Sequence, residues 1–248
     1  MMAAPSALLW MPYCGPAPGP DDWLTRWNGD PFLLLGLVLL AFGWRRLTGP
    51  GGITWSAAAL AILGLLFVTP FCALTSALFS ARVAHHVALA TVVPVLLVRS
   101  LPPNGPRLPG SLALWTAIQA VTFWLWHAPP LYAAALSSDL VYWAMQASLL
   151  VTAFCFWAAL RSAGAPAAVA ALLVSMVQMG LLGALLTFAG APLYAPHLFT
   201  TQAWGLTPLG DQQLAGLIMW APAAGLYLGA ALFLAGRWLT REDAGLAS

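Results

Sequence analysis

Long apolar segments separated by short connections dominate this chain of 248 residues, and they restrict it to a membrane-embedded fold. Each segment has roughly the twenty residues that an α-helix needs to cross the hydrocarbon core of a bilayer. Hydrophobic residues make up 61% of the chain and charged residues only 6%, a balance that argues against a soluble globular domain. We therefore predict seven transmembrane helices, over residues 31–48, 53–71, 82–101, 111–128, 139–160, 166–189 and 212–236.

The nine arginines, in a chain without lysine, predict how these helices are oriented. Two of them, Arg26 and Arg82, fall in the N-terminal tail and in the connections on the same side of the membrane. The other seven fall in the connections on the opposite side and in the C-terminal tail. Because positive charge collects on the cytoplasmic side, we expect the N-terminus outside and the C-terminus in the cytoplasm. The prediction is an all-α polytopic membrane helix bundle, with a translocated tail (1–30), a seven-helix domain (31–236) and a cytoplasmic tail (237–248).

Net charge, catalytic motifs and cysteines limit the functions that we expect of this chain. A net charge of +2 carried by dispersed arginines does not suggest nucleic-acid binding. The motifs GxSxG, HExxH, CxxCH and the P-loop are absent from the sequence, and the middles of the segments carry no Asp, Glu or Lys, so we do not expect an enzyme. Cys14 and Cys72 both map outside, where a disulfide is permitted, but no CxxC pair occurs. We expect free thiols at Cys14, Cys72 and Cys155.

All four histidines map near the predicted outer face. His85 and His86 lie in the outer third of the third segment, His127 at the outer end of the fourth, and His197 in the outer loop before the seventh. A histidine in an apolar segment is costly to desolvate and usually faces the bundle interior or a wet cavity. Neutral imidazole binds copper, zinc, iron and nickel, so these residues are candidates for a shallow metal site. The alternative for each is an interfacial side chain that hydrogen-bonds a neighbouring carbonyl.

Several polar or sulfur-containing residues accompany the histidines. Asp211 precedes a long apolar run, so we expect it to cap the seventh helix, with a ligand or proton-handling role as the alternative. Gln212 is expected to bond loop carbonyls from the first turn. Met145 lies with Gln146 one turn into the fifth segment. Met179 belongs to a patch in the sixth segment, for which packing is the usual role and a copper relay the alternative.

Prolines and small residues inside the segments predict features of the packing. Pro94 and Pro222 free backbone carbonyls, which must find partners within the bundle. Gly180 and Gly183 in the sixth segment, and the Gly225–Gly229 pair in the seventh, have the spacing of close helix contacts.

Three stretches carry a resemblance to a known family. They are Leu125-Trp126-His127-Ala128-Pro129 with Leu131-Tyr132, then residues 183–189, and the most specific, residues 211–220. Together with the surroundings of His86, they resemble the seven-helix CtaG-type cytochrome c oxidase assembly factors of bacterial membranes over about residues 31–236. These proteins are distinct from the single-span, cupredoxin-like copper chaperones of the same name.

The resemblance implies a function in the bacterial plasma membrane. We expect help in assembling haem–copper cytochrome c oxidase, including copper delivery or copper-site formation at the outer face. The expected partners are oxidase subunits and the lipid bilayer. A second copy of the chain, in a homo-oligomer, is a further candidate partner. The alternatives are a copper permease or resistance protein of the CopD type, and a haem-binding membrane redox protein that would use His86 and His127 at similar depth.

The resemblance also assigns candidate copper ligands. His86 and His127 match the family best, His197 is a third candidate, and His85 is an extra histidine beside the matched position. Where the family has a first histidine in the third segment, this chain has Arg82. Supporting positions are Asp211, Gln212, Tyr132, Met145 and Met179.

Overall fold

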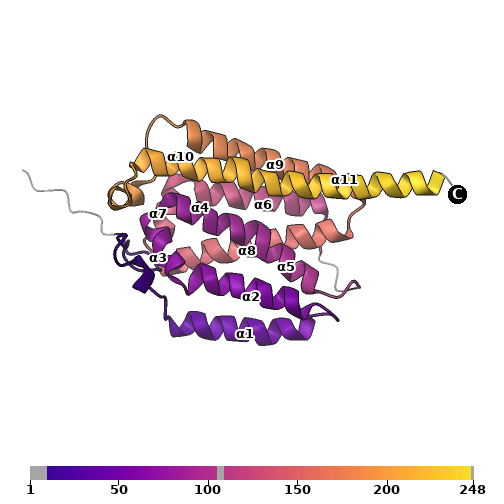
Figure 1. Cartoon of the computed structure of the whole chain (residues 1–248), viewed down its shortest axis with the longest axis horizontal. Helices are drawn as coiled ribbons and strands as arrows, with labels where there is room; N and C mark the ends of the chain where they lie inside the picture. The colour runs from indigo at the N-terminus through magenta and orange to yellow at the C-terminus, as the bar shows by residue number, and fades with distance from the viewer. Residues whose placement is uncertain (1–9, 105–108, 247–248) are drawn as a thin grey trace, which may run out of the picture.

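Helices form nearly all the regular structure in the computed structural model, which describes residues 10–104 and 109–246 (Figure 1). Two of the longer helical stretches contain a π-helical turn, and short 3-10 turns occur in the loops. The α-helices are α1 (Pro31–Leu47), α2 (Ile53–Phe67), α3 (Pro70–Ala77), α4 (Phe79–Val87), α5 (Val93–Ser100), α6 (Leu112–His127), α7 (Pro129–Ala135), α8 (Asp139–Ser162), α9 (Ala165–Phe188), α10 (Pro208–Ile218) and α11 (Ala224–Leu246).

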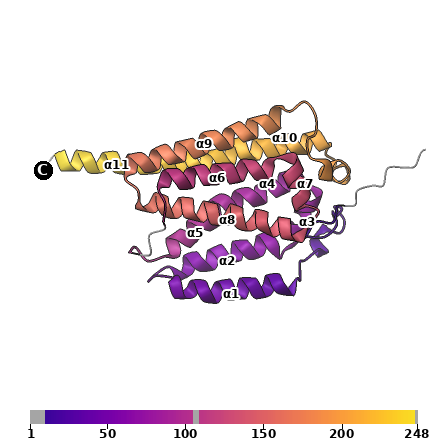
Figure 2. The same ribbon diagram turned by 180° about the vertical axis from the view of Figure 1, so that it is seen from behind.

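Four continuous stretches are long and apolar enough to cross a membrane: Phe79–Ser100, Asp139–Ser162, Ala165–Phe188 and Pro208–Arg241. The pair α2 and α3, bent by 49°, makes a fifth if it is one span. This confirms an all-α polytopic membrane protein. The remaining predicted segments coincide with α1 and α6, which have 17 and 16 residues and pack in the same bundle (Figures 1 and 2).

The third segment begins earlier than predicted, and this changes the place of Arg82. The predicted segment 82–101 places Arg82 at its very start, but α4 begins at Phe79 and encloses Arg82, which is fully buried. The Asp211 carboxylate in α10 accepts hydrogen bonds from the backbone N–H groups of Phe79 (2.6 Å) and Ser80 (3.2 Å). The first N–H groups of a helix lack partners within it, so this contact stabilises the early start.

Asp211 therefore does not cap the helix that contains it, and that prediction was wrong. The last long helical stretch begins at Pro208, and the Thr207 hydroxyl accepts from the Gly210 N–H at 3.0 Å. Threonine is a favoured N-cap and proline a favoured first helical residue, which explains the earlier boundary.

The two prolines inside segments coincide with π-helical turns. Ala88–Val92 precedes Pro94, and Met219–Ala223 contains Pro222. A proline cannot donate to the carbonyl four residues before it. For Pro94 that carbonyl belongs to Ala90, and it accepts from the indole N–H of Trp157 at 3.2 Å. The predicted need for a partner within the bundle is confirmed at this carbonyl.

Glycines bring α9 and α10 into close contact at one point. A Cβ added to Gly183 would lie 2.8 Å from the Gly216 carbonyl oxygen, and one added to Gly216 would lie 2.3 Å from Thr187 Oγ1. The packing prediction is confirmed for Gly183. Gly225 and Gly229 make no such contact within the chain, because an added Cβ would meet nothing within 4 Å there.

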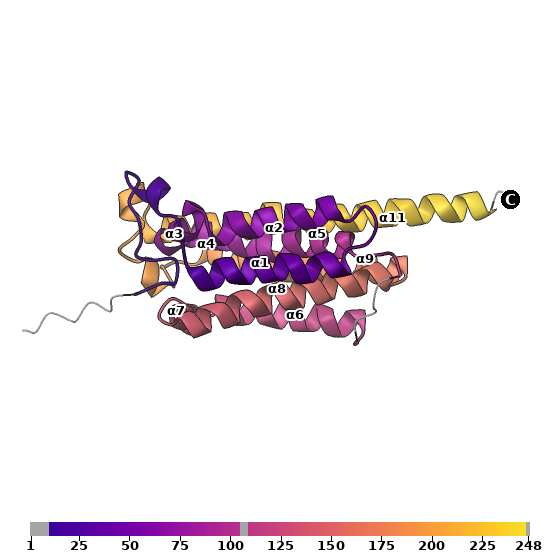
Figure 3. The ribbon, with the colours of Figure 1, turned by 90° about the horizontal axis from the view of Figure 1, so that it is seen from below.

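The N-terminal segment, α3, α7 and the loop 189–207 gather at one end of the bundle, which we call the loop end (Figures 1 and 3). There a disulfide joins Cys14 to Cys72, so the prediction of free thiols was wrong for this pair. The Tyr13 ring stacks on that of Tyr142 at 4.9 Å, which holds the segment against the bundle and places Cys14 beside α3. Cys155 is a buried free cysteine, as predicted.

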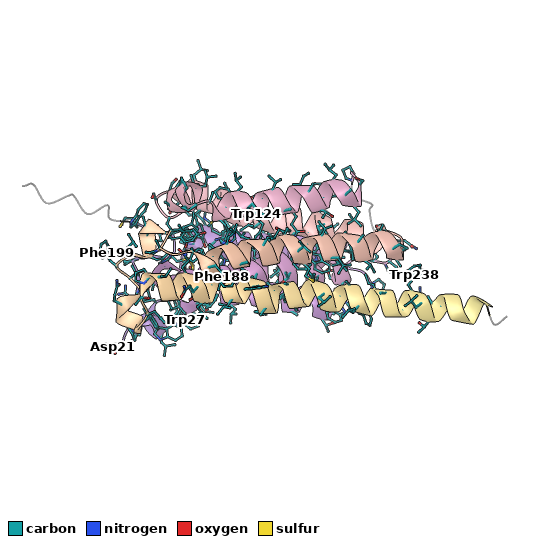
Figure 4. The ribbon with its side chains drawn as sticks, turned by 90° about the horizontal axis from the view of Figure 1, so that it is seen from above. Asp21, Trp27, Trp124, Phe188, Phe199 and Trp238 are labelled. Carbon is teal, nitrogen blue, oxygen red and sulfur yellow. A yellow bond between two sulfur atoms is a disulfide. The ribbon has the colours of Figure 1, made fainter. Side chains whose placement is uncertain are left out.

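The outer surface of the helices is strongly apolar. The side chains of Phe32 and Phe188 are 82% and 73% exposed. In Figure 4, Phe199 and Asp21 lie at the loop end, Phe188 lies along the helices, and Trp238 lies toward the opposite end. Exposed aromatic and aliphatic side chains along long helices are what a lipid-facing surface requires.

Candidate functional site

Buried polar side chains collect inside the bundle near the loop end. We define the polar cluster as Arg82, His85, His86, His127 and Gln146, none of which is more than 3% exposed. Each has at least one buried nitrogen or oxygen without a hydrogen-bond partner among the described residues. Such an atom costs about 1–3 kcal/mol when it is left unpaired. A cluster of this kind therefore has the chemistry of a binding site.

Three of the histidines form a row. The ring centroids of His85 and His86 are 5.8 Å apart, and those of His86 and His127 are also 5.8 Å apart, with the latter two rings nearly perpendicular. His85 meets the ring of Phe67 edge to face, at 4.9 Å between centroids. The predicted approach of His86 to His127 is confirmed.

The surroundings of His127 determine its tautomer. Its Nδ1 lies 2.7 Å from the Phe123 carbonyl oxygen, one turn earlier in α6. A carbonyl can only accept, so Nδ1 carries the proton and Nε2 has the lone pair. Among the described residues His127 Nε2 has no hydrogen-bond partner. A second-shell bond of this kind is typical of histidines that bind metal through the other nitrogen.

His197 has a different environment. Its Nε2 is 2.7 Å from the Tyr132 hydroxyl, and its Nδ1 is 3.3 Å from the Ala77 carbonyl oxygen. Burial, and to a lesser extent the positive charge of Arg82, lowers the pKa of His197 to about 3, so the ring is neutral. Nδ1–H donates to Ala77 and Nε2 accepts from Tyr132. Both nitrogens are engaged, and His197 links the outer loop to α3 and α7.

The structure does not bring His197 into one ligand set with His86 and His127. No group of three His, Cys, Asp or Glu side chains that could hold a metal ion occurs in the part of the chain that the structure describes. What it does assemble is the His86–His127 pair, with His85 next to it. Tyr132 supports His197 and packs edge to face on Phe79, at 5.2 Å.

Arg82 supplies the cluster's charge. Its guanidinium carbon lies 5.3 Å from the centroid of the Tyr142 ring, a cation–π arrangement. The one salt bridge among the described residues is the exposed Arg26–Asp22 pair, where Arg26 lowers the pKa of Asp22. Arg82 is thus a buried cation without a carboxylate partner in the described part of the chain.

The other supporting positions have structural contacts. The Gln212 side chain accepts from the Leu193 N–H at 2.7 Å and donates to the Leu186 carbonyl of α9 at 3.3 Å. It also donates to the Ala191 carbonyl at 3.5 Å, which confirms the predicted bond to a loop carbonyl. Met145 and Met179 are fully buried in the hydrophobic core. Gln178, beside Met179, accepts instead from the exposed Trp124 indole at 3.1 Å.

Sequence reasoning missed one buried polar pair. The Gln119 amide in α6 donates to the Tyr227 hydroxyl in α11 at 3.1 Å, and both residues are buried. An amide side chain within an apolar segment was the available signal, because such a group must find a partner inside the bundle.

Comparison with known families agrees with the resemblance carried by the sequence. The family model described as cytochrome c oxidase caa3 assembly factor (Caa3_CtaG) matches residues 107–241, a range that includes His127, His197 and Asp211. No curated protein and no solved structure matches the chain. Since the family match covers more than half of the sequence, the chain belongs to the cytochrome c oxidase caa3 assembly factor family.

Proposed function

We propose that this protein assists the assembly of haem–copper cytochrome c oxidase by handling copper at the outer face of the plasma membrane. Family membership supports the assembly role. The observation that carries the copper role is the buried His86–His127 pair near the loop end, with unprotonated nitrogen available on His127.

The proposal includes seven spans with the loop end outside. The α1 and α6 helices, together with α2, supply the spans beyond the four longest stretches. The exposed arginines near the ends of α1, α5 and α8 lie at the end opposite the loops: Arg45, Arg46, Arg99 and Arg161. Positive charge at that end supports a cytoplasmic orientation for it.

The residues present fit a copper ion as cargo. Imidazole nitrogen is a good ligand for copper. The centroid spacing of 5.8 Å leaves room for one ion between His86 and His127, because metal–nitrogen bonds are about 2 Å long. Two protein ligands make a site with open positions, from which an ion can be passed on.

The surrounding residues hold this pair in place. Asp211 fixes the start of α4, which carries His86, and the Phe123 carbonyl orients His127. The Tyr194 hydroxyl donates to the His127 carbonyl at 2.8 Å and so ties the outer loop to the end of α6. We propose that the loop end is also the surface that meets the oxidase subunit.

Copper content of the detergent-purified protein tests this function. We expect wild type to bind one copper ion per chain and the His86→Ala/His127→Ala double variant to bind none. His197→Gln is the matched control, because its two nitrogens are engaged in hydrogen bonds, and it should keep copper when purified as folded protein. Haem absorbance in wild type that is lost in the double variant would instead favour the haem-binding alternative.

The assembly step needs a cellular readout. In a strain that carries the double variant at wild-type protein level, oxidase subunits should be made but assembled, copper-loaded oxidase should be lost. Normal oxidase assembly in that strain would refute copper handling by the pair. Copper uptake into vesicles containing the purified protein would instead favour a permease.

A further inference from the structure

The guanidinium of Arg82 is a buried charge that lacks a counter-charge in the described part of the chain. Arg82 is 0% exposed, and its Nε, Nη1 and Nη2 atoms have no hydrogen-bond partner among the described residues. An arginine side chain stays protonated in proteins, so it cannot relieve this cost by losing its proton. A buried cation of this kind calls for an anion.

The carboxylate groups of the described residues do not supply that anion. Asp211 is the one buried carboxylate among them, and it accepts from the Phe79 N–H, the Ser80 N–H and the Ser80 hydroxyl. It forms no salt bridge with Arg82 among the described residues. Its negative charge is already engaged at the start of α4.

The side chains around Arg82 are neutral and leave its N–H groups unpaired. The guanidinium offers five N–H groups, and the nearby Gln146 amide offers two N–H groups and one acceptor oxygen, with neither amide atom paired among the described residues. Gln146 and Arg82 both lie beside the Tyr142 hydroxyl. The Tyr132 hydroxyl donates to His197 Nε2 and, like the Tyr142 hydroxyl, can still accept a hydrogen bond. These acceptors are neutral, so they do not balance the charge of the guanidinium, and the site favours an anionic ligand that is rich in acceptors.

We propose that Arg82 is the centre of a buried anion site that takes one carboxylate. Two carboxylate oxygens match the paired N–H groups of a guanidinium, and this bidentate arrangement is stronger than a contact with a single atom. The Tyr142 ring holds the guanidinium plane from one side, and Gln146 adds a further donor. The carboxylate comes from a free small acid or from an acidic side chain of a partner subunit.

The N-terminal segment packs over this site at the loop end. Tyr13 stacks on Tyr142, and the sulfur of Cys14 lies 3.6 Å from the Tyr142 hydroxyl. The disulfide fixes this segment to α3. A carboxylate that enters from the loop end, where we propose that the oxidase subunit docks, therefore has to displace or pass this segment.

Formate binding to the purified, copper-free protein tests the proposal. In chloride-free buffer, equilibrium dialysis with labelled formate should show one site per chain. Arg82→Gln should abolish that binding, and Arg82→Lys, which keeps the charge but not the planar fork, should weaken it at least tenfold. Arg99→Gln is the matched control, because Arg99 also stacks on an aromatic ring (5.2 Å from Trp55) but is exposed.

The outcomes separate this site from the copper pair. The His86→Ala/His127→Ala variant should still bind formate, so a failure of copper binding leaves the anion site standing. If Arg82→Gln does not fold, the test rests on two other measurements: the formate affinity of Arg82→Lys and the competition of chloride with formate for wild type. Absence of formate binding in wild type, equal binding by Arg82→Lys, or chloride binding as tight as formate would each overturn the proposal.

Co-purification with oxidase subunits distinguishes the two sources of the carboxylate. If the partner supplies it, formate should displace the subunit from wild type, and Arg82→Gln should retain little subunit in the first place. If a free acid supplies it, subunit binding should be indifferent to formate. Either result supports the site, provided that formate itself binds.

Discussion

The start of α4 depends on a carboxylate from α10, and replacing that carboxylate should have a large cost. In Asp211→Asn, one oxygen becomes an N–H₂ group that faces the Phe79 and Ser80 donors, which lie 2.6 and 3.2 Å from the carboxylate oxygens. Loss of a helix N-cap costs about 1 kcal/mol. A buried donor left unpaired adds about 1–3 kcal/mol. We expect Asp211→Asn to lower the free energy of unfolding by about 2–4 kcal/mol.

Unfolding of the detergent-solubilised protein by a denaturing detergent, followed by circular dichroism, measures this loss. Asp139→Asn is the matched control, because Asp139 is an exposed acid in the first turn of α8. Exposed substitutions of this kind usually change stability by no more than about 0.5 kcal/mol. Ser80→Ala removes the Ser80 hydroxyl, which also donates to Asp211, so a double-mutant cycle with Asp211→Asn should show coupling. Equal losses for Asp211→Asn and Asp139→Asn, or no coupling, would refute the capping role.

Three further predictions concern the packing and the N-terminal segment. Gly216→Ala places a Cβ 2.3 Å from Thr187 Oγ1 and should cost about 1–3 kcal/mol in the same assay, whereas Gly225→Ala, with open space around it, should be neutral. The Cys14–Cys72 disulfide closes a loop across 58 positions, so Cys14→Ser should lower stability by up to about 4 kcal/mol, and reductant should lower wild type but not the variant. The hydrogen bond from Tyr13 lowers the pKa of Asp30 below 3.8, so its stabilising effect is present above that pH and is lost as pH falls through the lowered pKa. Tyr13→Phe should raise that pKa toward 3.8 in ¹³C NMR titrations of labelled aspartate, and an unchanged value would contradict the contact.

Local apolar pattern was sufficient to predict most of the helices. The segments 139–160 and 166–189 correspond to α8 and α9 with shifts of only a few residues at their ends. Pro94 also predicted a freed carbonyl that needed a partner. It could not identify that partner, because Trp157 comes from another helix and is 67 residues from Ala90.

The errors arose where distant parts of the chain determine local structure. The boundary of α4 was misplaced because its cap, Asp211, lies 132 positions from Phe79. The disulfide was missed because the return of Cys14 to α3 depends on Tyr13 stacking against Tyr142, from α8. A short-range pattern contains no information about such contacts.

The candidate site was predictable only in part, because some of its contacts join distant parts of the chain. Histidines in apolar segments pointed to a buried cluster, and His86 does meet His127. The engagement of His197 with Tyr132 and Ala77 was not predictable, since both partners belong to other elements. Arg82 was placed at the very start of the third segment, and its complete burial was not predicted because the start of α4 depends on the distant Asp211.

Burial of Arg82 links the two proposed ligands. A copper ion at His86 and His127 and the guanidinium of Arg82 are like charges in one poorly screened interior, which disfavours copper when Arg82 is uncompensated. A carboxylate on Arg82 removes that repulsion, so formate should raise the affinity for copper. Linkage requires that copper raise the affinity for formate by the same factor, and couplings of this kind are typically about 5–150-fold. Copper titrations with and without formate, and formate titrations with and without copper, measure both factors. Arg82→Gln should bind copper at least as tightly as wild type and lose the formate effect, whereas a formate effect that persists in Arg82→Gln would refute the link.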